Sequence, residues 1–403
     1  MKKVAIIGGG ASGLVCAIEC ARAGLDVTLF EQNEKCGKKI LVSGNGKCNI
    51  TNKFLHFEDF EGENKRVVET VLERFGFKEQ QNYFASLGLL LTSKEEGRCY
   101  PYSMEAKSVL DVLLSASKQY GVKIKTGVKV EKVQKDFTLV LENGEKKKFD
   151  KVVIAAGSKA ASHLGGSESG YEIAKSFGHT VNQPYPSLVQ LCSSSRYPKM
   201  MSGVKLEAEV TLLVNGLKEQ HLKGDLLFTD YGLSGLAVLD LSQKASWALS
   251  QHYAVDIQIN LLPEWNQTHL ASHIVAIAKN NPGYTIETVL HTLLPLKVVR
   301  TLLVFLDIDP QSRRMDMKLV KRIVFRLQHW NFAINDTKGF RYAEVSGGGV
   351  KTEEIEPRTF ESKKRKGLYL VGEMLDVVGR RGGYNFAFAW GSGYLCAQAI
   401  IGK

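Results

Sequence analysis

Three glycines near the amino terminus have the spacing that lets a protein backbone cradle a phosphate. Gly8, Gly10 and Gly13 follow the apolar run 4–7, which predicts a buried strand leading into a turn. In this motif the first glycine supplies a tight turn, the second leaves the backbone bare for a pyrophosphate, and the third lets a helix pack closely on a strand. The free N–H groups at the start of that helix would face the phosphates. The spacing therefore predicts an anion-binding turn.

One acidic residue lies where the ribose of a dinucleotide would need it. A second apolar strand, 27–30, ends in Glu31, 18 residues beyond Gly13. An acid at about this interval can accept hydrogen bonds from ribose hydroxyls. The alternative is a glycine turn with a purely structural role. Because strand, glycine triad, helix, second strand and acid occur in this order, we predict dinucleotide binding.

The segment 31–52 is rich in glycine, asparagine and lysine, and it is predicted to be a long loop. Since it leaves the strand that carries Glu31, it can run past the rest of the cofactor. Lys38, Lys39 and Lys47 supply positive charge for phosphate. Hydroxyl, amide and bare backbone donors come from Ser43, Gly44, Asn45, Gly46 and Asn49. A solvated surface loop is the alternative interpretation.

Two further strand ends carry glycine signals. The apolar run 151–156 is followed by Gly157, and the run 367–373 ends in Gly372 and Glu373. Open α/β sheets bind ligands at the carboxyl ends of their strands. Gly383 then precedes a predicted helix over 385–400, whose amino end is a second anchor for a polar group. An extended FAD would use these additional contacts, whereas an NAD-only dehydrogenase would need the first turn alone.

The elements that must position these residues change in type along the chain. Helical periodicity occurs over 64–92 and 104–120. Three strands predicted to form a small meander on the main sheet follow at 122–125, 128–133 and 137–141. The segment 187–262 has strand-like runs and few helices, which predicts an antiparallel β module, and 267–334 predicts helices. The chain therefore appears as an α/β unit interrupted by an insert.

Length and charge limit the function classes. With 403 residues, 44% of them hydrophobic, the chain is predicted to form at least two domains. The net charge of +11 is scattered, which favours a solvated basic surface over a nucleic-acid or membrane partner. The basic helix predicted over 319–330 is likewise interpreted as a packed helix with a solvated face. No apolar run reaches the ~18 residues that span a bilayer, so a cytoplasmic location is expected.

The cysteines argue against a structural metal or disulfide framework. There are seven, an odd number, spread along the chain without a Cys-x-x-Cys pair or a matching histidine spacing. The sequence therefore predicts no metal site and no thioredoxin-like redox pair.

Several longer motifs carry a resemblance to a known family. In order along the chain they are GGGASG, GKKILVSGNGKCNITN, GRCYPYS, LLFTDYGLSG, SGGGV and GEMLDVVGRRGGYNFAFAWGSG. With these motifs the chain resembles the bacterial NAD(P)/FAD-dependent oxidoreductase family that includes aminoacetone oxidase and the proposed 3-dehydro-bile-acid Δ4,6-reductase. The resemblance implies a Rossmann-like FAD-binding domain (1–186 and 342–403), interrupted by an inserted β-barrel-like domain (187–262) and a helical subdomain (263–341).

The resemblance also implies roles for individual residues. The pyrophosphate would be held by Gly8, Gly10, Ser12 and Gly13, and the adenosine ribose by Glu31, with Val130 near the adenine side. The cofactor would be lined by Lys39, Ser43, Gly44 and Asn49, and its ribityl chain and isoalloxazine would meet Glu373, Gly383, Tyr384 and Asn385. The further residues predicted to bind the cofactor are Ala11, Gln32, Ala156, Gly157 and Gly372.

This chain departs from the family pattern at three positions. Lys47 stands where the family usually has Arg, which removes a planar bidentate donor. Asp230 and Leu236 stand where the family usually has His and Pro, so charge and proton transfer at the insert would differ. The candidates for an acid or base are Asp230, Tyr102, Tyr384 and Arg98, each weighed against a structural role.

The expected function is that of an FAD-dependent oxidoreductase. It would transfer a hydride or two electrons between flavin and a small organic substrate, with NAD(P)H as a transient co-substrate. Two alternatives stay open: an RNA- or membrane-associated flavoprotein or non-catalytic flavin scaffold, and an NAD-only dehydrogenase. Retained FAD predicts a yellow protein, whereas an NAD-only dehydrogenase predicts a colourless one.

Overall fold

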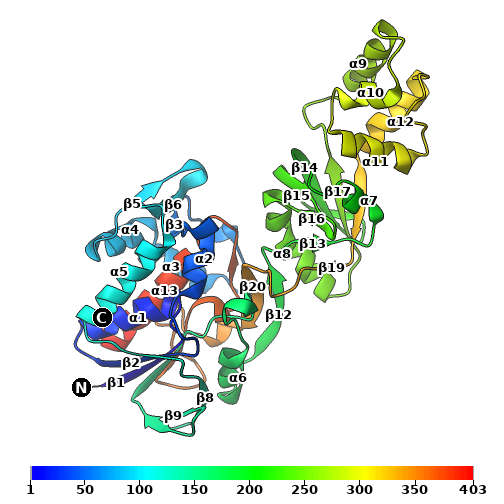
Figure 1. The fold of residues 1–403 in the computed structure, drawn as a ribbon. Helices are drawn as coiled ribbons and strands as arrows, with labels where there is room; N and C mark the ends of the chain where they lie inside the picture. Colours follow the sequence, from blue (N-terminus) through cyan, green and yellow to red (C-terminus); the bar gives the residue numbers. More distant parts are fainter. Residues whose placement is uncertain (1, 403) are drawn as a thin grey trace. The chain divides into compact units, whose positions relative to one another are not determined.

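The computed structural model describes residues 2–402 (Figure 1). The chain divides into two compact units. The first unit combines the residues up to Tyr185 with those from Glu344 onward, and the second is the continuous segment Pro186–Ala343. Each unit has its own hydrophobic core. The predicted division into three parts, with a further boundary at 262, stays a prediction.

A five-stranded parallel sheet forms the centre of the first unit. Its order across the sheet is β21 (Leu368–Leu370), β11 (Lys151–Ile154), β1 (Lys3–Ile7), β2 (Asp26–Glu31) and β7 (Lys123–Thr126). All four neighbouring pairs are parallel. The central strands are continuous apolar runs because both faces of the sheet are covered, as parallel sheets require. The glycine turn after β1, Glu31 at the end of β2, Gly157 after β11 and Glu373 after β21 therefore all lie at the carboxyl ends of strands, at one edge of the sheet.

Helices of the first unit pack on this sheet or on one another. They are α1 (Ala11–Arg22), α2 (Lys38–Gly46), α3 (Arg66–Arg74), α4 (Phe77–Ser86), α5 (Ala106–Gln119), α6 (Ser169–Ser176) and α13 (Tyr384–Ile401). The first and last of these pack closely, because a Cβ on Gly393 of α13 would lie 2.3 Å from the carbonyl oxygen of Ser12 in α1. Ser392 also accepts a hydrogen bond from the backbone N–H of Gly372 at 3.0 Å. The carboxyl-terminal helix is thus fixed against the amino-terminal turn.

Short sheets complete the first unit. They are β8 (Val130–Val133) with β9 (Thr138–Leu141) and β10 (Lys146–Lys148); β3 (Thr51–Asn52) with β6 (Arg98–Pro101) and β5 (Leu91–Ser93); β12 (Val181–Ser187) with β20 (Val345–Val350); and β4 (Phe60–Glu61) with β22 (Val378–Gly379). The predicted meander was partly wrong, since β7 joins the main sheet beside β2 and only the later strands form a separate sheet.

The prediction of a long loop over 31–52 was also wrong. Residues from Lys38 form α2, which begins after Gly37 in the left-handed region at φ 70°. The helix buries Ile40, and its regular geometry is lost between Ser43 and Asn45. Glycine and asparagine dominate the composition only in the second half of the segment. They therefore mark the residues at which the helix loses its regular geometry. Their abundance made the whole segment resemble a loop, so the regular first turn was not predicted.

A seven-stranded antiparallel sheet forms the centre of the second unit. Its order is β18 (Trp330–Ile334), β17 (Val255–Asn260), β14 (Lys205–Val214), β15 (Leu217–Phe228), β16 (Gly232–Ser234), β13 (Leu191–Cys192) and β19 (Asp336–Thr337). Only Asn335 separates β18 from β19, so one extended segment pairs with both β17 and β13. Trp330, predicted as the end of a helix, begins this segment.

Helices surround this sheet and extend beyond it. They are α7 (Arg196–Met200), α8 (Leu236–Ser250), α9 (Gln267–Asn280), α10 (Ile286–His291), α11 (Leu296–Leu306) and α12 (Met317–Gln328). The sequence missed α8, because its apolar residues do not form a single stripe and small residues such as Ala245 and Ala248 provide its buried contacts. Between residues 2 and 402 no helix combines the length and apolar character needed to cross a membrane.

Candidate cofactor-binding site

The three glycines of the amino-terminal turn have different surroundings. Gly8 has a φ of +113°, and a Cβ on it would lie 2.2 Å from the carbonyl oxygen of Ala155. A Cβ on Gly13 would lie 2.0 Å from the carbonyl oxygen of Gly8. The position of a Cβ on Gly10, in contrast, has no atom within 4 Å. Gly8 and Gly13 are therefore required by packing inside the protein, whereas the open space at Gly10 is available to a ligand.

The amino end of α1 is suited to an anion. Gly10 is the N-cap residue, it offers no side-chain cap, and the first turn contains no acidic residue. The first N–H groups of a helix lack partners within the helix, and the helix dipole places partial positive charge on them. A pyrophosphate fits this position, because it brings acceptor oxygens to the N–H groups and meets no Cβ at Gly10.

Glu31 is held in place at the end of β2. It is only 8% exposed. Its Oε2 accepts from the backbone N–H of Gly9 at 2.8 Å, and its Oε1 accepts from the backbone and side-chain nitrogens of Asn33 at 2.8 and 2.7 Å. A carboxylate has about four lone-pair positions and three of them are used here, so the fixed group can still accept from one ribose hydroxyl. Gln32, the neighbouring predicted residue, donates to the carbonyl oxygen of Gly165 at 2.7 Å.

We expect Glu31→Gln to weaken FAD binding by about tenfold, because hydrogen bonds to a charged acceptor are roughly twice as strong as neutral ones. Titration of the apoprotein with FAD, followed by quenching of flavin fluorescence, measures the change. Glu34→Gln, at an exposed position nearby, is the matched control. Equal dissociation constants for the two variants would contradict the assignment of Glu31.

Lys39 and Glu373 form the centre of a second cluster. The Lys39 Nζ lies 2.5 Å from the Oε2 of Glu373. The other oxygen, Oε1, accepts from the Ser158 hydroxyl at 2.9 Å and from the Ser346 backbone N–H at 3.2 Å. Residues from α2, from the end of β11, from β20 and from the end of β21 therefore meet at one carboxylate. Gly157 precedes Ser158 with a φ of +70° and open space around it.

A third group of predicted residues gathers around Asn49. The Asn49 Oδ1 accepts from the backbone N–H of Cys99 at 3.2 Å. This oxygen would lie 2.9 Å from a Cβ on Gly383, and the Asn49 backbone nitrogen would lie 3.2 Å from a Cβ on Gly44. The broken end of α2, which includes Ser43, thus lies beside the glycine turn that starts α13.

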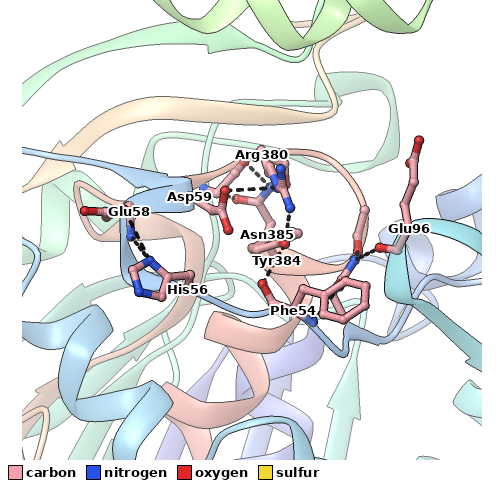
Figure 2. A network of polar contacts seen from close by, with 11 residues as sticks. Phe54, His56, Glu58, Asp59, Glu96, Arg380, Tyr384 and Asn385 are labelled. Carbon is pink, nitrogen blue, oxygen red and sulfur yellow. Dashed lines mark hydrogen bonds and ion pairs between the residues drawn. The ribbon is translucent and has the colours of Figure 1, made fainter.

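Polar contacts hold the turn before α13 (Figure 2). The Tyr384 hydroxyl accepts from Arg380 Nη2 at 2.5 Å and donates to the carbonyl oxygen of Phe54 at 3.0 Å. Arg380 also lies 3.3 Å from a carboxylate oxygen of Asp59. The Asn385 side chain bonds both the N–H and the carbonyl oxygen of Gly379, at 2.8 and 2.7 Å. These contacts use the side chains of Tyr384 and Asn385 to shape the turn.

Tyr384 is better suited to positioning than to acid catalysis. It is 1% exposed, and burial raises the pKa of its phenol, although the nearby Arg380 opposes the shift. We expect Tyr384→Phe to cost about 1–2 kcal/mol of stability, because the Phe54 carbonyl loses its donor and Arg380 loses its acceptor. Its kcat should fall by less than tenfold, whereas removal of a general acid costs about 100-fold or more. Thermal unfolding and steady-state kinetics give the two values, and a 100-fold loss of kcat with unchanged stability would contradict this assignment.

The other predicted residues lie in different surroundings. Arg98 pairs with Glu96 at 2.9 Å, and its side chain is 3.7 Å from the position of a Cβ on Gly382. Tyr102 is 75% exposed. Asp230 belongs to the second unit. Val130 is buried in β8, two residues after Val128, whose N–H donates to the carbonyl oxygen of Glu31 at 3.0 Å. The roles of these residues stay predictions.

Several residues of this arrangement were missed from the sequence: Asn33, Ser158 and Ser346, with Arg380 and Asp59 near α13. Ser158 and Ser346 had a usable signal, since one follows Gly157 at a strand end and the other lies in the glycine-rich run 345–350. A cavity of about 1020 Å³, lined by α3 and residues between 352 and 363, contains none of the predicted cofactor residues. Over residues 2–402 no three His, Cys, Asp or Glu side chains are grouped so as to hold a metal ion.

Comparisons with known proteins complete the description. The family described as HI0933-like protein Rossmann domain matches residues 2–399. The chain is 36% identical to a 3-dehydro-bile acid delta(4,6)-reductase of Clostridium scindens, over 99% of both proteins. It is 34% identical to a ribosomal RNA dihydrouridine synthase of Haemophilus influenzae, over 98% of this chain and 97% of that protein. A solved 3-ketosteroid delta1-dehydrogenase from Sterolibacterium denitrificans shares the fold over the full length of both chains, with a TM-score of 0.51 and 11% identity.

Proposed function

The chain belongs to the HI0933-like Rossmann-domain family, and from this membership we propose that it is an FAD-dependent oxidoreductase. The proposal rests on the arrangement of groups at the carboxyl edge of the parallel sheet. There the uncapped amino end of α1, the open backbone at Gly10 and the fixed carboxylate of Glu31 match the needs of a dinucleotide. FAD, when bound, supplies hydride or two-electron exchange with a substrate.

The chain's own residues would bind this cofactor in an extended form. Ser12 in the first turn of α1 contacts Gly393, and α13 begins nine residues earlier at Tyr384. At 1.5 Å per residue, the point where α13 contacts the amino end of α1 and the amino end of α13 itself lie roughly 13 Å apart along α13. The glycine turn of α1 and Glu31 would hold the adenosine diphosphate part. The Lys39 and Glu373 pair and the turn before α13 would hold the remainder.

The names of the relatives suggest a reaction class. A 3-dehydro-bile acid with delta(4,6) unsaturation and a uridine both contain a carbon–carbon double bond conjugated to a carbonyl group. We therefore propose that the substrate contains such an activated double bond. Reduction would add a hydride equivalent to the β-carbon and a proton to the α-carbon, while NAD(P)H is oxidised to NAD(P)⁺ and one solvent proton is consumed.

A second candidate is the same reduction on uridine within RNA. It is favoured by the two relatives named ribosomal RNA dihydrouridine synthase and by the net charge of +11. The two candidates share the cofactor and the bond that is reduced. They differ in whether the substrate is a free small molecule or a polyanion.

The visible spectrum of the purified protein tests the proposal. Flavin bands should be present or appear with added FAD, and they should bleach with NADPH or NADH in the absence of oxygen. Addition of a 3-oxo-4-ene steroid or of a uridine-containing RNA should then restore the bands, and product analysis should show the saturated carbon–carbon bond. No bands after incubation with FAD would refute the cofactor, and bleached bands that neither acceptor restores would refute the reaction class.

A further inference from the structure

Helix α12 presents two faces of opposite character. One face packs into the core of the second unit through Val320, Ile323, Val324 and Leu327. The other face is exposed and carries Lys318, Lys321, Arg322 and Phe325, which we call the α12 outer face. Figure 1 shows α12 grouped with α9, α10 and α11 within the second unit. Packing explains the first face and leaves the composition of the second unexplained.

The charge around this helix is strongly one-sided. Residues 313–326 contain six Lys and Arg and a single acid, Asp316. Asp316 caps the helix by accepting from the N–H of Leu319, and it pairs with Arg314. Among residues 2–402, Lys318 and Lys321 have no carboxylate within ion-pair distance, so their charges are available to a ligand.

An exposed aromatic ring lies within this basic face. Phe325 is 53% exposed, and its ring stacks on His329 with centroids 4.7 Å apart and planes 18° apart. Residues three and four positions apart are neighbours on a helix surface, so Lys318, Lys321 and Phe325 form one continuous stripe. A phenyl ring held flat beside free cations can stack a base while the cations neutralise phosphates.

We propose that the α12 outer face binds single-stranded RNA. The open face of Phe325 requires an unpaired base, because the bases of a duplex are already stacked on one another. A membrane is a poorer match, since a helix that lies on a bilayer turns its apolar face outward, whereas the apolar face of α12 is buried in the protein. Charge complementarity therefore selects a polyanion with accessible bases.

This inference rests on the proposed function in one respect, because it selects RNA over a free small molecule as the substrate of the proposed reduction. Binding of RNA itself needs neither the flavin nor the reaction, so the two can fail separately. The basic residues of the α12 outer face are ones that the sequence alone had assigned to a solvated face.

The test measures fluorescence anisotropy of a labelled oligouridylate of about 16 nucleotides with the full-length protein. Binding should weaken steeply between about 50 and 200 mM salt. The double variant Lys318→Glu/Lys321→Glu should reduce affinity by about tenfold or more. It should also reduce the slope of log affinity against log salt concentration by the equivalent of about two phosphate contacts. The double variant Lys199→Glu/Lys218→Glu changes the net charge equally at exposed positions of the same unit and should bind as the unaltered protein does.

The aromatic contribution is tested separately. Phe325→Ala should weaken binding by about tenfold, and Phe325→Trp should restore it, because stacking depends on the aromatic face. The proposal is overturned if the unaltered protein does not bind the oligouridylate, if the α12 variants bind as well as the controls, if a duplex of equal length binds as tightly, or if anionic vesicles bind in place of RNA. If RNA binding failed but NADPH still bleached the flavin in every variant, the proposed oxidoreductase activity would stand and only the RNA-binding role of the α12 outer face would be rejected.

Discussion

Replacing Gly10 by aspartate is expected to weaken FAD binding by about 1000-fold while the protein keeps its stability. Gly10 has a φ of −86°, which any residue adopts, and its Cβ would enter open space. Aspartate is among the best N-cap residues, so α1 should gain a few tenths of a kcal/mol. The new carboxylate, however, would lie where the pyrophosphate approaches, and two unit charges about 4 Å apart near a protein surface repel by roughly 4 kcal/mol.

Thermal unfolding of the apoprotein and FAD titration separate these two effects. Gly10→Ala should give an intermediate loss of affinity, because it adds the Cβ without the charge. Glu105→Asp places the same residue at the N-cap of α5 and should leave FAD binding unchanged. If Gly10→Asp bound FAD normally, the phosphate-binding role of the turn would have to be abandoned.

Replacing Gly393 by alanine should destabilise the first unit by about 2 kcal/mol or more, against the usual preference of helices for alanine. Inside a helix, glycine to alanine normally stabilises by about 0.5–1 kcal/mol. Here the added Cβ would lie 2.3 Å from the Ser12 carbonyl oxygen and 3.0 Å from its carbonyl carbon, both backbone atoms of the α1 turn. The two helices must move apart, and overpacking of this kind costs about 1–3 kcal/mol or more.

The sign of the change is the decisive measurement. Chemical denaturation should give a lower free energy of unfolding for Gly393→Ala. The control Ala399→Gly, at a half-buried position of the same helix, should lose only about 1 kcal/mol from helix propensity. A stabilised Gly393→Ala protein would mean that α1 and α13 are not in close contact. Because Ser12 belongs to the turn that we propose binds phosphate, FAD affinity should fall together with stability.

Local patterns in the sequence were sufficient for the fold class and the amino-terminal turn. The apolar run 4–7, the glycine triad and Glu31 lie within one short segment, so their spacing reflects their geometry directly. The contact between Lys39 and Glu373 joins residues 334 positions apart, and no local pattern could pair them. Burial of Ile40 turns part of a glycine-rich segment into α2, and pairing with β2 places β7 in the main sheet. Tertiary contacts determined these elements.

The insertion of the second unit has a consequence for how the chain is made. Pro186–Ala343 is continuous, so this unit can complete its core soon after it leaves the ribosome. The first unit lacks β21 and α13 until residues 368–401 have been synthesised, well after the second unit, and until then the edge of β11 and the face of α1 around Cys16 stay uncovered. Uncovered strand edges and apolar helix faces favour aggregation during synthesis. A chain truncated before α13 would therefore retain a folded second unit attached to a first unit that chaperones and proteases recognise.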